Sequence, residues 1–199
     1  TVCGETRITA AKKQSGLRIE QVSLHPQAPR ALASVIEAID QSDLIILGPG
    51  SLYTSVIPNL LVDGVSQALR RSPALKIYVL NIMTQEGETE GYTAAQHVQA
   101  VNRHARGRVV DVCLYNTQAV HPRIVAKYRG ENCAQLFPDP ELFEKMGVRL
   151  FGGQILARGS EYARHDPLRL AYTIMQAAQT YAPRPGLLGK YDSFLLRRE

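Results

Sequence analysis

The sequence predicts an α/β fold in which βαβ units build a parallel sheet. Three short apolar runs, 44–47, 76–81 and 109–115, have the length and composition of buried strands. Segments with apolar residues at helical spacing lie between these runs, and such alternation is typical of parallel sheets. A chain of 199 residues with 45% hydrophobic residues is long enough to form one such domain around a normal core.

The first half of the chain supplies a helix, a strand and a second helix. Residues 31–39 carry apolar side chains on one helical face. The run 44–47, Leu-Ile-Ile-Leu, is wholly apolar, as expected of a strand buried on both faces. Gly48-Pro49-Gly50 ends this strand, and a helical pattern resumes through 60–69. These elements form the first predicted βα unit.

The second half repeats this alternation. After the strand at 76–81, the apolar spacing predicts a helix over 93–104, followed by the strand at 109–115. The remaining expected elements are a short helix at 122–128 with Pro at its first position, a short strand at 150–151, and a final helix that starts at Asp166-Pro167 and runs to about Tyr181.

Composition excludes several classes of protein. No apolar run approaches the roughly 20 residues that span a bilayer. The net charge of +5 favours anionic ligands, but no nucleic-acid recognition motif accompanies it. The three cysteines, Cys3, Cys113 and Cys133, lack metal-ligand or redox spacing, which indicates reduced thiols and a cytoplasmic protein. The chain begins without a methionine, which indicates a fragment or a processed chain.

The segment 48–55 is the first candidate site. Gly48 and Gly50 allow a backbone to approach an anion closely, and Ser51 and Ser55 offer hydroxyl donors. Backbone N–H groups at a following helix start favour a phosphate or pyrophosphate. The segment is neither a Walker A motif nor the dinucleotide Gly-x-Gly-x-x-Gly. The alternative is a tight turn in which a serine caps the next helix.

The second candidate segment, 81–93, is almost entirely polar or glycine and directly follows an apolar strand. Its glutamates suit a cation such as Mg²⁺ or ligand hydroxyl groups. The alternative is a solvated acidic loop that caps the helix beginning at Thr93. The side chains concerned are Asn81, Thr84 and Gln85, which suit paired hydrogen bonds to a base, sugar or acid, and Glu86, Glu88 and Glu90, which suit a cation.

The third candidate is His165-Asp166-Pro167. A histidine beside a carboxylate suits acid–base work. The plainer interpretation is that Asp166 caps the final helix and His165 orients it. No catalytic triad and no set of metal ligands is evident elsewhere in the sequence.

The string from Asp43 to Val62 resembles the signature of the gluconeogenesis-factor (YvcK-type) branch of the CofD-like family. Further matches follow in the same order, and the resemblance covers roughly residues 4–181. The loop Gly48-Pro49-Gly50-Ser51-Leu52 differs from the Gly-Pro-Ser-Asn-Pro of the transferase branch. The later matches are Asn81-Ile82-Met83-Thr84-Gln85, Gly87-Glu88-Thr89, Gly91-Tyr92-Thr93, His97-Val98 and His165-Asp166-Pro167.

The resemblance implies a Rossmann-like, doubly wound, mostly parallel sheet with helices on both faces. The transferase branch moves a phospholactyl group from a guanylated donor onto a deazaflavin. The gluconeogenesis-factor branch has no settled reaction, is linked to cell shape and gluconeogenic growth, and binds UDP-sugars. Two departures stand out: no Gly-rich loop precedes Thr1, so the N-terminal part of the fold is missing, and Glu86 stands where the family pattern has Pro.

We therefore expect a CofD-like domain over 1–181 and a tail over 182–199. The expected function is cytoplasmic UDP-sugar binding by a regulator, and the alternative is a phospho-group transferase; a protein-interaction module that uses the tail is a third interpretation. The ligand is a UDP-sugar or another nucleotide, with Mg²⁺ as a candidate cation, and the partner is a second copy or a separate N-terminal piece. The expected ligand-binding residues are Gly48, Gly50, Ser51, Ser55, Asn81, Thr84, Gln85 and Thr89, with Tyr53, His165 and Asp166 in supporting roles.

Overall fold

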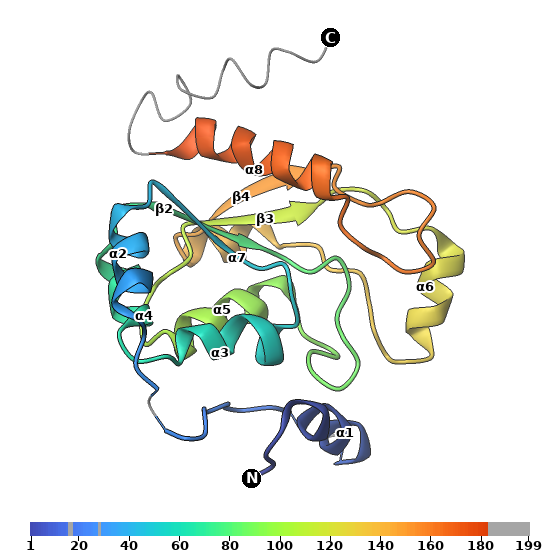
Figure 1. Ribbon diagram of the computed structural model, residues 1–199. Helices are drawn as coiled ribbons and strands as arrows, with labels where there is room; N and C mark the ends of the chain where they lie inside the picture. Colours follow the sequence, from blue (N-terminus) through green and yellow to red (C-terminus); the bar gives the residue numbers. More distant parts are fainter. Residues whose placement is uncertain (16–17, 28, 183–199) are drawn as a thin grey trace.

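The structure, a computed structural model, describes residues 1–15, 18–27 and 29–182. Four strands form one sheet in the order β1-β2-β3-β4, and every neighbouring pair is parallel (Figure 1). The predicted α/β fold with a parallel sheet is confirmed. The strands are β1 Leu44–Leu47, β2 Leu75–Val79, β3 Val112–Asn116 and β4 Arg149–Gly153.

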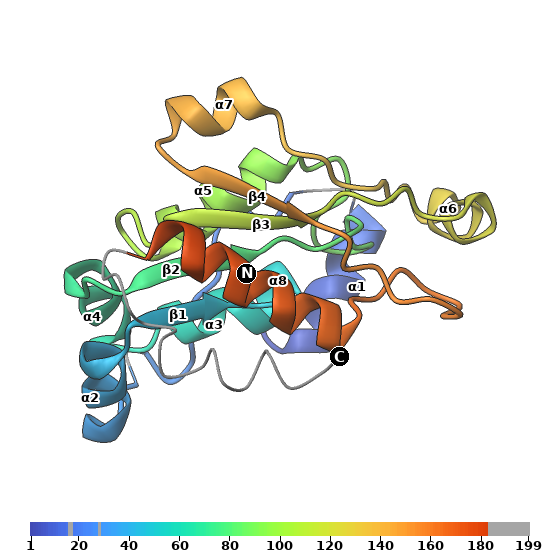
Figure 2. The same cartoon turned by 90° about the horizontal axis from the view of Figure 1, so that it is seen from above.

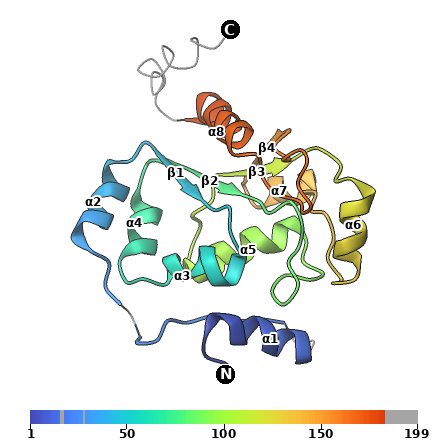
Figure 3. The same ribbon diagram turned by 45° about the vertical axis from the view of Figure 1, so that its right-hand side comes forward.

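Helices cover both faces of the sheet, as a doubly wound fold requires. Helix α8 (Pro167–Tyr181) lies across one face, whereas α5 (Ala94–His104) lies beneath the other (Figure 1, Figure 3). Seen from above in Figure 2, α7 lies beside β4 and α2 lies on the β1 side. The remaining helices are α1 Glu5–Ser15, α2 Ala33–Gln41, the π-helical η1 Leu52–Val56, α3 Ile57–Leu60, α4 Val65–Arg71, α6 Pro122–Arg129 and α7 Pro140–Lys145.

The sheet separates two apolar clusters, because successive side chains of a strand point to opposite faces. In β2, Ile77 and Val79 face the cluster that contains α8, and Tyr78 faces the cluster that contains η1 and α5. All five residues of β2 are buried, which explains why this strand is a continuous apolar run apart from Lys76.

Two helix starts follow from their capping residues. Thr93 and Gln96 form a reciprocal capping box at the start of α5. The Asp166 carboxylate accepts hydrogen bonds from the backbone N–H groups of Leu168 and Arg169, at 3.1 and 3.0 Å. The predicted capping role of Asp166 is therefore confirmed.

Some elements differ from the prediction. Helix α1 was not expected, because its residues show no apolar stripe. The third strand begins at Val112 and not at 109, although Val109 and Val110 are fully buried. The expected tail, 182–199, lies almost wholly outside the described residues. The interpretation that this tail binds a partner therefore stays a prediction.

Strand β1 lies at one edge of the sheet, with β2 as its only strand partner among the described residues. The side chain of Ile46 in β1 is 43% exposed. An open strand edge invites pairing with another chain. The expectation of a second copy, or of a separate N-terminal piece, stays a prediction. Within the described ranges, no helix is both long and apolar enough to cross a membrane.

Three histidines predict how stability depends on pH. Burial lowers the pKa of His97, His104 and His165, and backbone hydrogen bonds offset this only in part. The unfolded chain, with histidine pKa values of about 6.5, therefore binds more protons than the native one in mildly acidic solution. We expect the free energy of unfolding to be highest above about pH 6.5 and to fall as the pH drops towards about 5. Urea unfolding at a series of pH values checks this, and a flat profile across that window would contradict it.

Candidate functional site

A cavity of about 880 Å³ lies where the carboxyl ends of β1 and β2 meet. Since the two strands are parallel, with Leu47 opposite Tyr78, the segments that follow them leave the sheet at the same edge. The loop before α8 and the end of α6 complete the walls. The lining residues are Thr9, Pro49, Gly50, Ser51, the segment 81–86, Tyr128, Glu131, Ala163, Arg164 and His165.

The first wall of the cavity is the segment Pro49–Ser51, and Gly48 and Gly50 allow its close packing against the rest of the protein. Gly48 has a φ of +87°, in the region that favours glycine, and a Cβ there would lie 3.3 Å from the Val79 carbonyl oxygen. A Cβ on Gly50 would lie 3.0 Å from Cβ of Ser55. Gly48 itself is not part of the lining. Both glycines therefore let this turn lie close against its own neighbours.

Ser51 and Ser55 are placed differently. Ser51 lines the cavity, and its side chain makes no capping hydrogen bond to η1. The alternative of a serine-capped turn is therefore not what the structure shows. Ser55 is exposed and lies outside the cavity lining.

The second wall contains both free and engaged polar side chains. Asn81 and Gln85 line the cavity, and no hydrogen bond of their side chains is present among the described residues. Oγ1 of Thr84 accepts a 2.8 Å hydrogen bond from the Ala134 backbone N–H. Thr89 lies behind the wall, 1% exposed, and its Oγ1 accepts from the Gln85 N–H at 2.9 Å. Thr89 therefore supports Gln85 and does not face the cavity.

The three glutamates of this segment do not share a site. Glu86 lines the cavity. Glu88 is fully buried and bonds to η1, and Glu90 pairs with Lys12. Across the described ranges, no group of three His, Cys, Asp or Glu residues is arranged to hold a metal ion. The structure therefore gives the hypothesis of a shared Mg²⁺ no support.

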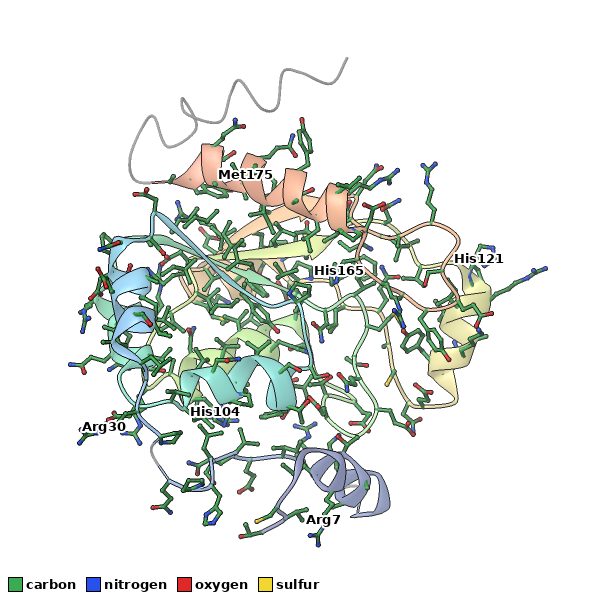
Figure 4. The ribbon with its side chains drawn as sticks, viewed as in Figure 1. Arg7, Arg30, His104, His121, His165 and Met175 are labelled. Carbon is green, nitrogen blue, oxygen red and sulfur yellow. The ribbon has the colours of Figure 1, made fainter. Side chains whose placement is uncertain are left out.

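His165 reaches the cavity from the loop before α8. Figure 4 shows its side chain toward the interior, whereas His121, directly before α6, lies at the outside of the molecule. Its Nε2 atom is buried and has no hydrogen-bond partner among the described residues. Burial lowers the pKa of the ring, and a hydrogen bond to the Leu80 backbone opposes this effect. The lowered pKa favours the neutral imidazole, and its Nε2 atom lies unpaired within the wall of the cavity.

The other supporting candidates lie outside the cavity. Asp166 caps α8, so its carboxylate is not free to orient His165 for acid–base work. Tyr53 is buried, and its hydroxyl lies 2.8 Å from that of Tyr92. It contributes to the core beside η1.

Sequence reasoning missed several lining residues, three of which carry long polar or aromatic side chains. Arg164 is exposed, and its guanidinium forms no ion pair or hydrogen bond within the described part of the chain. Tyr128 and Glu131 come from the end of α6 and the turn after it. Only Arg164 had a signal in the sequence, as the cation next to His165. The other two are brought in by tertiary packing alone.

Comparison with known proteins identifies the family. The model of the family described as 2-phospho-L-lactate transferase CofD matches residues 1–156. This chain belongs to the CofD family. This chain is 37% identical over 175 residues to the gluconeogenesis factor of Halalkalibacterium halodurans, and the match covers 88% of this chain and 53% of that protein. It is 39% identical over 170 residues to the gluconeogenesis factor of Bacillus subtilis, covering 85% and 52%.

A solved structure agrees with this assignment. A UPF0052-family protein from Bacillus halodurans superposes with a TM-score of 0.78 at 35% identity, covering 84% of this chain and 54% of that one. The predicted resemblance to the gluconeogenesis-factor branch is confirmed. This CofD-family chain spans about half the length of the curated relatives it matches.

The supporting role of Thr89 can be tested by an isosteric substitution. Thr89→Val keeps the side-chain volume but removes the acceptor of the Gln85 N–H. We expect the free energy of unfolding to fall by about 1–3 kcal/mol, as for a lost partner of a poorly solvated donor. Thr89→Ser retains the hydroxyl and serves as the control. If urea unfolding gave equal stabilities for Thr89→Val and Thr89→Ser, the proposed support would be wrong.

Proposed function

We propose that the cavity binds a nucleotide-linked sugar, a UDP-sugar in the first instance, and that this protein is a cytoplasmic gluconeogenesis factor that regulates carbon metabolism and cell shape by binding it. One observation carries the proposal: several residues that line one cavity have polar groups without hydrogen-bond partners among the described residues. Groups that cannot be satisfied within the protein are expected to meet water or a ligand. They are Ser51, Asn81, Gln85, Arg164 and Nε2 of His165.

Three of these residues suit phosphate. The Arg164 guanidinium offers several donors in a planar fork that matches phosphate oxygens. The Ser51 hydroxyl in the first wall and the Asn81 amide in the second wall add neutral donors. A cation and two neutral donors facing the same space favour an anionic group of the ligand there.

Two other lining residues, Glu86 and Glu131, suit hydroxyl groups. The hydrogen bond from the Thr84 N–H to the Ala134 carbonyl brings their segments together. Carboxylates accept hydrogen bonds from hydroxyls but repel phosphate, and the ring of Tyr128 offers an apolar face. The volume of about 880 Å³ lies within the range of small-molecule sites and leaves room for more than a phosphate.

His165 also supports a second candidate function, a phospho-group transferase. A neutral imidazole with one unpaired nitrogen suits proton transfer to or from a substrate hydroxyl. The description of the matched family names a transferase, whereas the relatives are called gluconeogenesis factors. Release of a product from UDP-glucose or a guanylated donor would favour the transferase, and reversible binding without turnover favours the regulator.

Titration calorimetry with UDP-glucose tests the binding proposal. Arg164→Gln removes a charge that we expect to contact phosphate, and such contacts contribute about 1.5–3 kcal/mol, so the affinity should fall by roughly tenfold to a hundredfold. The matched control is Arg158→Gln, an exposed arginine of the same loop outside the cavity lining, which should bind like the wild type.

Two results would overturn the assignment. The first is wild-type protein that binds neither UDP-glucose nor UDP at millimolar concentration. The second is equal affinity of the Arg164→Gln and Arg158→Gln variants for UDP-glucose, which would place the phosphate elsewhere.

A further inference from the structure

Glu88 carries a fully buried carboxylate that does not line the cavity. Its side chain is 0% exposed and absent from the cavity lining. Oε2 accepts a 3.0 Å hydrogen bond from the Tyr53 N–H, and Oε1 accepts a 2.6 Å hydrogen bond from the Thr54 hydroxyl. Both donors belong to η1, the segment that directly follows Ser51. Glu88 therefore fixes η1 from the opposite side of the loop.

The same residue is anchored to the second wall. The Glu88 N–H donates to the Gln85 carbonyl at 3.2 Å, and the Thr89 N–H donates to the same oxygen at 2.9 Å. Oγ1 of Thr89 accepts in return from the Gln85 N–H. The turn 85–89 is thus closed by its own hydrogen bonds. Gln85 at its start lines the cavity, and Glu88 near its end is buried against η1.

A buried carboxylate is costly unless its environment compensates for lost hydration. In the described parts of the chain Glu88 has no cation within ion-pair distance, and the nearby Lys12, whose pKa is lowered by burial, is paired with Glu90. The two hydrogen bonds to η1 are its side-chain compensation. A carboxylate kept at this cost, at the junction of two cavity walls, has a role that apolar packing would not fill.

We propose that Glu88 is a positioning residue that ties the Pro49–Ser51 wall to the Asn81–Glu86 wall and so sets the distance between Ser51 and Gln85. Its carboxylate takes up the Tyr53 N–H and the Thr54 hydroxyl, two of the donors that the segment after Ser51 would otherwise offer to a ligand phosphate. We therefore expect the phosphate to bind through the Ser51 hydroxyl and Arg164. The part of this inference that concerns ligand affinity rests on the proposed function, whereas the part that concerns wall geometry does not.

Hydrogen exchange tests the geometric part without any ligand. In Glu88→Ala, the amides of residues 50–56 should exchange on the order of tenfold faster or more, while those of β2 and β3 stay protected. Glu88→Gln should restore protection, because its oxygen accepts from the Tyr53 N–H and its amide donates to Thr54. The matched control is Asp111→Ala. That variant removes a carboxylate that accepts from the Lys76 N–H at 3.0 Å, at the opposite end of the sheet.

Titration with UDP-glucose tests the functional part on the same variants. Glu88→Ala should bind roughly tenfold or more weakly, and Glu88→Gln and Asp111→Ala should bind like the wild type. Unchanged exchange of residues 50–56 in Glu88→Ala, or Glu88→Gln as impaired as Glu88→Ala in both measurements, would overturn the positioning role. Equal loss of affinity in Asp111→Ala would show a general stability effect instead. Failure of the wild type to bind UDP-glucose would overturn the proposed function, and the exchange result would still decide the geometry.

Discussion

The parallel pairing of β1 with β2 is the constraint on which the site depends. The two strands run in the same direction, with Leu44 to Leu47 opposite Leu75 to Tyr78. The segments that follow them therefore leave the sheet at the same edge. An antiparallel pair would place Ser51 and Asn81 at opposite ends of the sheet. Because pairing is parallel, a glycine-rich turn and a polar segment separated by about 30 residues meet around one cavity.

The polar residues of this region fall into two groups by hydrogen bonding. Thr84, Thr89 and Glu88 have their side chains satisfied by nearby backbone or side-chain groups, and they hold the walls in place. Ser51, Asn81, Gln85, Arg164 and Nε2 of His165 have no such partners within the described part of the chain. A precise site needs rigid supporting residues behind free ligating ones, and this division matches that requirement.

Much of this could be predicted from the sequence. Apolar runs indicated β1 and β2, because a strand buried on both faces leaves few polar positions. Asp166 before Pro167 predicted the start of α8. The glycine-rich turn and the polar segment indicated Ser51, Asn81 and Gln85 as candidate ligand-binding residues, and all three line the cavity.

The remainder depends on partners that a sequence does not display. Thr84 and Thr89 carry the same hydroxyl as any ligand-binding threonine, and only the fold shows that Ala134 and Gln85 use them. Glu88 looks like one of three acidic residues on an exposed loop until its burial beneath η1 is seen. Tyr128 and Glu131 reach the cavity through α6, with no local pattern to indicate it.

The central claim is that the free polar groups of the cavity bind the phosphates of a nucleotide-linked sugar. A crystal structure of the protein grown with UDP-glucose tests it most directly. We expect diphosphate oxygens at about 3 Å from the Ser51 hydroxyl and the Arg164 guanidinium, with Glu88 still bonded to Tyr53. A nucleotide bound elsewhere on the molecule, with Ser51 and Arg164 free of contact, would contradict it.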